Sequence, residues 1–597
     1  MIPNNTHEIE LLDAQVAKIS EEAAMILEKA RLLKFKRNSL TLIYQLPPEL
    51  LSRIFHFHAK HTIQVNYEFQ GGDLVNFMHV CQHWRKVAVE TPDIWSTPDF
   101  RRPKWAQEMV ARSKTTPLTL VTSNLAGESH ADGKVESAVE VLRREHHRVH
   151  ELDMAFGDHS NPYTPIEKWL SQISDIEAPR LRRLCLEIRP GRRSLTFPFL
   201  PEFFFRERCP RLKYVTLRHF DLDKSWNSFI LRNLTSLCLG ISISSSDAYP
   251  YWNRGAPLGL DKLLFILRNC PDLELLQLQS CCKVAEEHSV SSLTPVKLPR
   301  LRRFEVTETP SMSRALVELI SFPNLESISL SFISLRRASD QDQLDLRRMM
   351  EQLFHSSSSL SESHLMKPRS LFCYTSSASH KNVAALKFYT SYEPYRNPDS
   401  LDSNASIAIR FAVEKHGFSA LEPKNFFPIL YESMSTVIAA APLLKLEYAC
   451  AQFTDPLCRL QTELITSRLG HLHTLKEFIV AGKETYVSVV DALGRQTGPE
   501  CQTGISFASL QKISFLLVGV SQDPSTFQTR LDPESPGFQS ATKWYGTQFG
   551  AEHWLLANLR LRKSAAGTAG IEKIIIDQAP VHLEDLRELV GDVEILD

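Results

Sequence analysis

Two histidine clusters are the residues whose types and spacing could bind a metal ion. The two clusters are His56, His58 and His61, and His146, His147 and His150. Histidines three apart on a helix can share a metal, but a site needs further ligands at matched geometry. We therefore interpret both clusters as exposed or packing histidines. We interpret the adjacent Cys281 and Cys282 as one core residue and one residue that faces away.

No established catalytic motif stands out along the chain. It lacks a G-x-x-x-x-G-K-S/T phosphate loop, a G-x-G-x-x-G turn after a strand, a G-x-S-x-G elbow and an H-E-x-x-H helix. The 11 cysteines include no C-x-x-C pair, which favours reduced buried thiols over disulfides or structural zinc. We predict no catalytic residue, no metal and no cofactor. Scattered catalytic groups can still converge in a fold, so turnover by the pure chain would revive an enzyme hypothesis.

The elements that organise the chain lie between Leu46 and Trp95. The Pro47-Pro48 pair predicts the start of a helix. Proline has no N–H group, and the N–H groups of the first helical turn have no acceptor within the helix, so proline loses no hydrogen bond there. One apolar stripe follows at helical spacing: Leu50, Leu51, Ile54, Phe55 and His58. A second helix is predicted after Asp73, with apolar residues continuing to Ala88, and Thr91-Pro92 ends it. Two such short helices cannot bury both stripes alone.

The same residues resemble an F-box, in the form common in fungal F-box-like proteins. The shared pattern is Leu46-Pro47-x-Glu49-Leu50, Ile54-Phe55, Val80-Cys81-x-x-Trp84-Arg85-x-x-Ala88 and Pro92-x-x-Trp95. The resemblance implies a small helical module that docks on a Skp-type adaptor held by a cullin ubiquitin ligase. Carried over by position, the adaptor-binding residues are Leu46, Pro47, Leu50, Ile54, Phe55, Val80, Cys81 and Trp84. The segment from His56 to Asp73 departs from the family pattern, because it is longer than the compact form.

Composition and charge limit the classes of partner. A hydrophobic content of 43% and a charged content of 23% are those of a folded soluble protein. A net charge of −1 provides no field to gather a polyanion, which argues against nucleic acid and membrane surfaces as partners. No apolar run is long enough to span a bilayer, and the first residues lead into acidic residues instead of an apolar signal core. We expect an intracellular protein, cytoplasmic or nuclear.

The segment from Ile9 to Leu33 carries a seven-residue apolar repeat. Its members are Ile9, Leu12, Val16, Ile19, Ala23, Ile26, Ala30 and Leu33. Such spacing predicts an amphipathic helix, and a helix of this kind can self-associate as a coiled coil. The alternative is that the helix packs on the following module or on a neighbouring helix.

Most of the remaining chain repeats one short line, Pro-x-Leu-x-x-apolar-x-apolar. Strong copies begin at Pro179, Pro210, Pro271, Pro299 and Pro323, and one without proline begins at Leu234. They lie about 22 to 39 residues apart. Weaker copies begin at Val149, Val383, Leu443, Leu475, Leu510 and Ile571. Five copies that share the leading proline favour a repeat over isolated buried strands.

These copies resemble an irregular leucine-rich-repeat solenoid, of the kind found behind F-boxes. The resemblance implies short parallel strands in a curved sheet, each followed by a returning helix. Segments 262–269 and 314–320 are predicted as such helices. The concave face would then carry the outward strand residues. As target-binding residues we predict Arg183, Glu187, Tyr214, Thr216, Arg218, Gln277, Gln279, Arg303, Glu305 and Thr307.

The predicted fold class is α/β, with an N-terminal helix, a small all-α F-box module and a solenoid with a parallel curved sheet. The expected domains are 1–40, the amphipathic helix; 41–100, the F-box-like domain; 101–337, the first solenoid part; 338–379, a polar, serine-rich insertion; and 380–597, degenerate repeats and a cap. We predict a non-catalytic substrate receptor of a Skp–cullin–F-box ubiquitin ligase. The alternative is an interaction scaffold that has no ligase role and dimerises through the N-terminal helix.

Overall fold

The computed structural model of the chain divides into two compact units. The first comprises Met1–Ser194 with Phe203–Leu212, and the second comprises Leu195–Glu202 with Lys213–Asp597. The structure describes residues 6–65, 72–122, 131–157, 166–189, 199–200, 209–225, 229–240, 258–283, 293–333, 340–355, 368–377, 381–389, 407–414, 426–441, 443–453, 458–494, 507–516, 531, 535–545, 548–564, 570–576 and 582–596.

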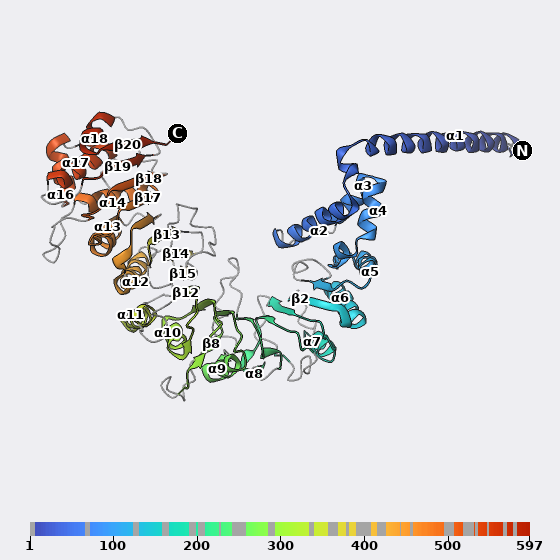
Figure 1. Cartoon of the computed structure of the whole chain (residues 1–597), viewed down its shortest axis with the longest axis horizontal. Coiled ribbons are helices and arrows are strands. Elements are labelled where there is room, and N and C mark those ends of the chain that lie inside the picture. The colour runs from blue at the N-terminus through green and yellow to red at the C-terminus, as the bar shows by residue number, and fades with distance from the viewer. Residues whose placement is uncertain are drawn as a thin grey trace, which may run out of the picture. The chain divides into compact units, whose positions relative to one another are not determined.

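The first unit begins with one long helix, α1 (Thr6–Ser39), drawn as an unbroken rod in Figure 1. This confirms the helix predicted from the seven-residue repeat. The large apolar side chains of that repeat do not pack on the neighbouring module: each is at least 53% exposed. The structure therefore does not show the packed alternative.

The helical module that follows α1 consists of six short elements. They are η1 (Leu42–Gln45), α2 (Pro48–Val65), α3 (Gly72–Val80), α4 (Gln82–Glu90), η2 (Pro92–Trp95) and α5 (Pro103–Arg112). The predicted start of α2 is confirmed, because the N–H groups of Leu50 and Leu51 both donate to the Pro47 carbonyl, at 3.0 and 3.2 Å. The first predicted helix of the module is present as α2, but the second predicted helix is divided into two.

The single helix predicted after Asp73 is wrong, because the chain breaks it into α3 and α4 at Cys81. Cys81 has an extended backbone, with φ −161° and ψ 170°. Its thiol accepts the N–H of Trp84 at 3.4 Å and so caps α4. The predicted end is confirmed, since α4 stops at Glu90, before Thr91-Pro92. In the long segment after Phe55, α2 continues to Val65 and residues 66–71 lie outside the described residues.

The rest of the first unit is a three-stranded parallel sheet with helices between the strands. Its strands are β1 (Leu118–Val121), β2 (Val149–Gly157) and β3 (Arg183–Arg189), in that spatial order. The connecting helices are α6 (Ala131–Glu145), η4 (His146–Arg148) and α7 (Ile166–Ser174). Leu152 pairs with Leu184 and Met154 with Leu186, so the apolar positions of two predicted repeats are in register.

In the second unit the strong copies of the repeat form adjacent parallel strands. These are β4 (Tyr214–Arg218), β5 (Ser236–Gly240), β7 (Leu275–Gln279), β10 (Arg303–Glu308) and β12 (Ser327–Ile333). Short elements and returning helices join them: α8 (Leu222–Ser225), η5 (Phe229–Leu231), β6 (Leu258–Gly259), α9 (Leu260–Arg268), β8 (Cys282–Lys283), β9 (Val296–Lys297), α10 (Pro310–Leu319) and β11 (Ile320–Ser321). The helices predicted at 262–269 and 314–320 correspond to parts of α9 and α10.

After β12 the order of strands reverses. Helix α11 (Asp340–His355) leads to β13 (Ser370–Ser377), β14 (Lys381–Tyr389) and β15 (Ile407–Glu414), followed by α12 (Phe426–Ala440). The spatial order is β12-β15-β14-β13-β16, because β14 pairs antiparallel with both neighbours. The weak copy at Val383 is therefore an antiparallel strand and not a solenoid repeat. The segment predicted as an insertion contains α11, while residues 356–367, with the serine run, lie outside the described residues.

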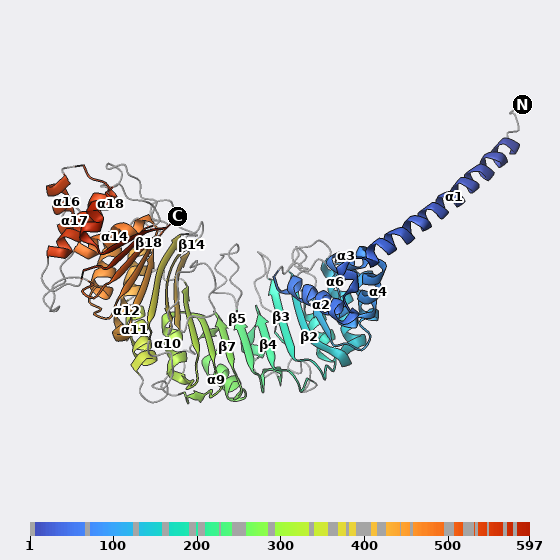
Figure 2. The ribbon, with the colours of Figure 1, turned by 45° about the horizontal axis from the view of Figure 1, so that its top comes forward.

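The parallel pattern then resumes to the end of the sheet. Its strands are β16 (Tyr448–Gln452), β17 (Glu477–Ala481), β18 (Lys512–Leu516), β19 (Lys573–Ile576) and β20 (Asp592–Ile595). The helices are η9 (Leu443–Lys445), α13 (Cys458–Leu464), η10 (Ile465–Leu469), α14 (Lys483–Gly494), α16 (Pro536–Tyr545), α17 (Ala551–Ser564) and α18 (Leu583–Leu589). Figure 2 shows helices of this unit along one side of its strands.

One main-chain arrangement recurs at the start of the strands. The N–H groups of Glu274 and Leu275 both donate to the Thr235 carbonyl, at 2.8 and 3.1 Å, and those of Arg302 and Arg303 donate to Glu274. The same pair of hydrogen bonds to one carbonyl recurs at later strands. Gln511 and Lys512 donate to the Lys476 carbonyl, and Glu572 and Lys573 donate to the Gln511 carbonyl. The weak copies at Leu475, Leu510 and Ile571 therefore continue the geometry of the strong ones. Among the described residues, no helix is both long enough and apolar enough to cross a membrane.

Candidate interaction surfaces

Helix α2 carries two apolar stripes, where the sequence predicted one. Leu51, Phe55 and Ala59 are buried, and they form the module core with Val87, Ala88, Ile94, Trp95 and Met109. A second stripe, at spacings of four and three, consists of Leu50, Ile54 and Phe57, which are 44%, 46% and 64% exposed. The module therefore buries one face of α2 and leaves an apolar face outside its own core.

Aromatic rings fix the buried face of α2 against the two following helices. The Phe55 ring stacks on Phe77 of α3, with centroids 4.4 Å apart, and lies 5.2 Å from Trp84 of α4. Trp95 donates its indole N–H to the Ala88 carbonyl at 2.9 Å, and Arg112 lies 4.9 Å above its ring. The ring contacts of Phe55 pack the buried face of α2 against α3 and α4, so the exposed stripe lies on the opposite side of a packed helix.

The structure separates the eight predicted adaptor-binding residues into two groups. Leu50, Ile54, Val80 and Pro47 are exposed, and Val80 is 53% exposed at the end of α3. Phe55 is buried, while Leu46, Cys81 and Trp84 are half-buried; Leu46 and Trp84 pack against the module core. The first group can touch another protein, and the second supports it from within. Phe57 was missed, although its spacing from Leu50 and Ile54 could have indicated it.

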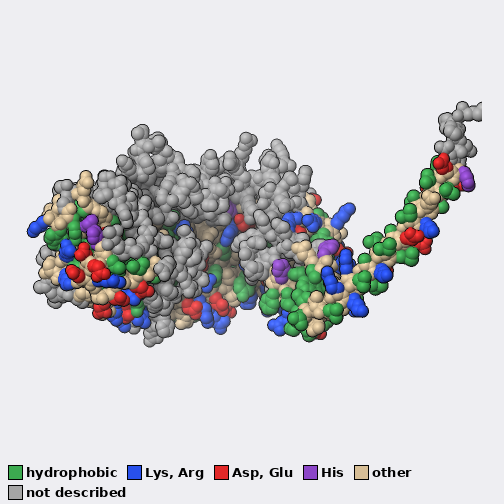
Figure 3. Space-filling model, turned by 90° about the horizontal axis from the view of Figure 1, so that it is seen from above, with side chains coloured by type: hydrophobic (Ala, Val, Ile, Leu, Met, Phe, Trp, Pro, Cys, Tyr) green, Lys and Arg blue, Asp and Glu red, His purple; other side chains and the backbone are tan. Residues whose placement is uncertain are grey.

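Apolar exposure is concentrated in this part of the chain. Figure 3 shows hydrophobic side chains along α1 and on the surface of the helices next to it. Besides the stripe of α2, Leu42 and Ile43 of η1 are exposed. A folded surface rarely leaves several large apolar side chains uncovered on one short helix unless another protein covers them.

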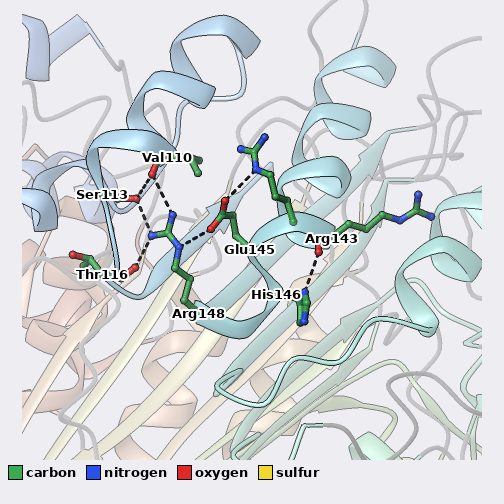
Figure 4. A network of polar contacts seen from close by, with 8 residues as sticks. Val110, Ser113, Thr116, Arg143, Glu145, His146 and Arg148 are labelled. Atoms are coloured by element: carbon green, nitrogen blue, oxygen red, sulfur yellow. Dashed lines mark hydrogen bonds and ion pairs between the residues drawn. The ribbon is translucent and has the colours of Figure 1, made fainter.

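A buried arginine ties the module to the first strands of its unit, as Figure 4 shows. Arg148, which is 4% exposed, donates to the Val110 and Thr116 carbonyls and to the Ser113 hydroxyl, at 3.1, 2.8 and 2.9 Å. The Nε atom of Arg148 donates to a Glu145 carboxylate oxygen at 2.8 Å. Burial by itself raises the pKa of Glu145, but hydrogen bonds from Arg148 and Arg144 hold that pKa below its ordinary value. The end of α5 is thus bonded to the start of β2.

The predicted target-binding residues of the second unit line up in rows across its strands. Tyr214, Ser236, Leu275, Arg303 and Ser327 are successive partners in one row. The next rows are Thr216, Cys238, Gln277, Glu305 and Ser329, and then Arg218, Gly240, Gln279, Thr307 and Ser331. The alternate residues of these strands are buried leucine, valine, isoleucine and phenylalanine. Alternation predicted which side chains share this face.

These rows are polar and partly exposed. Tyr214 and Arg303 are exposed, while Thr216, Arg218, Gln277, Gln279, Glu305 and Thr307 are half-buried. Arg183 and Glu187 lie on β3 in the first unit, where Arg183 is exposed and Glu187 is half-buried. The set is therefore divided between the two units. Mixed charge with a tyrosine and arginines matches the residue types enriched in protein interfaces.

Farther along, the same face becomes apolar. The row that contains Glu305 and Ser329 continues through Ala408, Lys387, Phe372, Cys450 and Ile479. A cluster forms there from Phe372, Tyr374, Ala385, Tyr389 and Cys450. Sequence reasoning missed this cluster because it read the segment as an insertion. The signal was the unbroken apolar run Leu371-Phe372-Cys373-Tyr374, which is typical of a strand buried on both faces.

The histidine clusters do not form a metal site within the part of the chain that the structure describes. The Nδ1 atom of His146 lies 2.9 Å from the Arg143 carbonyl, and the His61 side chain lies outside the described residues. Cys281 is buried, as the interpretation of one core residue requires, whereas Cys282 is half-buried, and the two sulfur atoms lie 3.6 Å apart. With Glu308 they make the single group of potential metal ligands among the described residues.

Residues 43–101 match the family model described as F-box-like. This range covers η1 to the residues before α5, including both stripes of α2. The resemblance that rested on Leu46 to Trp95 is confirmed for this region, and an F-box-like domain indicates an F-box protein. F-box domains generally bind Skp-type adaptors, and F-box proteins are typically non-catalytic substrate adaptors. Compared with curated proteins, the chain has no match.

Proposed function

We propose that this protein is the substrate-recognition subunit of a Skp–cullin–F-box ubiquitin ligase, and that the exposed stripe of α2 binds a Skp-type adaptor. The observation that carries the proposal is the position of Leu50, Ile54 and Phe57 on a module whose own core is already complete. Val80, at the end of α3, is a further exposed apolar side chain of the same module. Covering these side chains by a partner removes apolar area from water, and that is the main driving force of association.

The second part of the proposal is that the polar rows of the second unit bind a protein target. The strands of this unit would act as an irregular leucine-rich-repeat scaffold, because the same pair of main-chain hydrogen bonds to one carbonyl recurs at the start of early and late strands. Tyr214, Arg218 and Arg303 are the side chains best suited as anchors. The chain would perform no chemistry and would hold target lysines near a ubiquitin-charged enzyme in trans. A cytoplasmic or nuclear location is part of this proposal.

Copurification from cells that express a Skp-type adaptor tests the adaptor step. The intact chain should retain the adaptor, and the double variant Leu50→Asp, Ile54→Asp should lose it. These positions are exposed, so the change leaves the module core intact, unlike a change at Trp84. The matched control is Leu344→Asp on α11, where the leucine is 38% exposed in the other unit. An adaptor retained by the double variant would refute the proposed surface.

A second candidate function is a scaffold that self-associates through α1. The favouring observation is the exposure of the seam residues Ile9, Leu12, Val16, Ile19, Ile26 and Leu33. The charges of α1 are also divided. Residues 6–21 hold Glu8, Glu10, Asp13 and Glu21 against Lys18, whereas residues 22–39 hold Glu22 and Glu28 against Lys29, Arg31, Lys34, Lys36 and Arg37. Opposite charges meet when two copies pair antiparallel, so that is the orientation we propose.

Sedimentation equilibrium distinguishes the two candidates when it is combined with the copurification. A scaffold that dimerises through α1 should become monomeric in the variant Ile19→Asp, Ile26→Asp, and its dimer should weaken at high salt. A chain that remains monomeric at all concentrations would remove this candidate. Adaptor binding without dimerisation supports the ligase subunit alone.

A further inference from the structure

Cys281 and Cys282 lie where the chain turns from β7 into β8, and main-chain hydrogen bonds fix this turn on both sides. Ser280, at the end of β7, has φ +47°, and its N–H donates to the Thr307 carbonyl at 2.7 Å. The Leu258 N–H donates to the Cys281 carbonyl at 2.7 Å. Consecutive side chains of an extended strand point to opposite faces. Here the turn instead brings the two sulfur atoms to 3.6 Å from each other.

A buried carboxylate completes the group from the neighbouring strand. Glu308, at the end of β10, is 7% exposed. Its Oε1 atom accepts the N–H groups of Cys281 and Cys282 at 2.7 and 3.1 Å. These two bonds hold the carboxylate beside the cysteine pair, where one of its oxygen atoms lies within 4.8 Å of both sulfur atoms. The main chain of the cysteine pair thus holds the Glu308 side chain next to the two thiols.

The sulfur–sulfur distance is close to that of a tetrahedral zinc centre. Zinc binds thiolate sulfur at about 2.3 Å and carboxylate oxygen at about 2.1 Å, which places two sulfurs about 3.8 Å apart and a sulfur and an oxygen about 3.6 Å apart. The sulfur–sulfur separation is 3.6 Å, and the three ligand atoms all lie within 4.8 Å of one another. A small shift of the carboxylate would therefore close the site.

We propose that Cys281, Cys282 and Glu308 bind one Zn²⁺ ion, with a solvent molecule as the fourth ligand. Cys281 and Glu308 are buried, whereas Cys282 is half-buried and leaves a route from solvent. Thiolates and a carboxylate form a donor set that zinc accepts, whereas calcium and magnesium prefer oxygen alone. The ion would join the residues that follow β7 to the end of β10, next to the paired residues Gln279 and Thr307. This inference does not depend on the proposed ligase role.

Without a cation, ionisation of all three groups in this cluster is energetically unfavourable, because their negative charges would lie close together in a buried place. A hydrogen bond with Cys281 and burial raise the pKa of the Cys282 thiol, and burial raises the pKa of Glu308 to about 7. Zinc would supply the compensating charge and displace the protons. A plain thiol–carboxylate hydrogen-bond cluster is the alternative, and it would hold its protons and bind no metal.

Titration of the intact, reduced, metal-free chain with Co²⁺ tests the proposal. Thiol counting after denaturation first establishes that the pair is reduced. One equivalent of Co²⁺ should produce a thiolate-to-cobalt charge-transfer band, and Zn²⁺ should abolish it. Both Cys281→Ser and Cys282→Ser should lose the band. The matched control is Cys270→Ser, which removes a buried thiol of the same unit that bonds the Leu231 carbonyl, and it should keep the band.

The variant Glu308→Gln distinguishes the loss of a metal ligand from the loss of the folded structure. The amide oxygen can still accept both backbone N–H groups, so the turn should stay folded while Zn²⁺ affinity falls at least about tenfold. Two results would overturn the proposal. The first is a reduced wild-type chain without a band. The second is a band of unchanged affinity in Cys281→Ser, Cys282→Ser and Glu308→Gln, because the metal would then be bound elsewhere.

Discussion

The F-box-like region and the sheet of the second unit each present side chains that their own folding does not need, but the two surfaces differ in chemistry. On α2 the surplus residues are Leu50, Ile54 and Phe57. On the sheet the exposed positions are polar, and the apolar positions of the same strands are buried. Exposed apolar side chains indicate a binding site for another protein, whereas rows of polar side chains resemble an ordinary solvent-exposed surface. The adaptor surface is therefore easier to recognise than the target surface.

The largest expected effect separates the two faces of α2. Phe55→Ala removes a fully buried ring that stacks on Phe77, so it should lower the free energy of unfolding by about 3 to 5 kcal/mol. Phe57→Ala, two residues later on the exposed face, should change it by less than about 0.5 kcal/mol. Urea denaturation measures both. Equal losses would mean that both faces of α2 are buried.

The next effect tests the link between the module and its neighbouring strands. Arg148→Met leaves the Val110 and Thr116 carbonyls and Glu145 without their buried donor, and it should cost about 3 to 4 kcal/mol. Arg144→Met, which removes the half-exposed partner of the same Glu145, should cost less than about 1 kcal/mol. Thermal unfolding distinguishes them. A mild effect of Arg148→Met would show that α5 does not depend on this network.

In the second unit, Glu308 should make the stability of the metal-free chain depend on pH. Its pKa of about 7 lies above the ordinary 4.5, so the folded chain binds more protons than the unfolded chain between these values. Stability should therefore fall as pH rises from 4.5 to 7, by about 3 kcal/mol. Glu308→Gln should lack this component, and denaturation of both proteins across that range measures it. Identical pH profiles would contradict the burial of this carboxyl.

The smallest stability effect is expected where the functional effect should be largest. Leu50→Ala and Ile54→Ala remove exposed side chains, so each should change the free energy of unfolding by about 0.5 kcal/mol or less. Chemical denaturation of each single variant measures this. Losses above about 2 kcal/mol would place these residues in a core and remove the reason for an adaptor surface.

The sequence predicted those features that depend on local spacing. The line Pro-x-Leu-x-x-apolar-x-apolar identified β3, β4, β7, β10 and β12, because its leading turn and its alternation are encoded within eight residues. Alternation also placed Gln277 and Glu305 on one face. The order β12-β15-β14-β13-β16 could not be predicted in this way, because strand pairing is decided by contacts between distant segments.

Other features could not be predicted because the same sequence pattern is compatible with two different structures. Leu50 and Leu51 are equally apolar, and only tertiary packing decides which of the two is buried. The break between α3 and α4 depends on the Cys81 thiol acting as a cap, which a cysteine rarely signals. The meeting of Cys281, Cys282 and Glu308 depends on a positive φ at Ser280 and on the pairing of β7 with β10.

The measurement that tests the central claim most directly is the affinity of a purified Skp-type adaptor for the intact chain, by isothermal titration calorimetry. Wild type and Leu344→Asp should bind with the same dissociation constant, while Ile54→Asp should weaken binding at least about 100-fold with its fold unchanged. Binding by Ile54→Asp at the wild-type affinity, or no binding by the wild-type chain, would contradict the claim that the exposed face of α2 is the adaptor site.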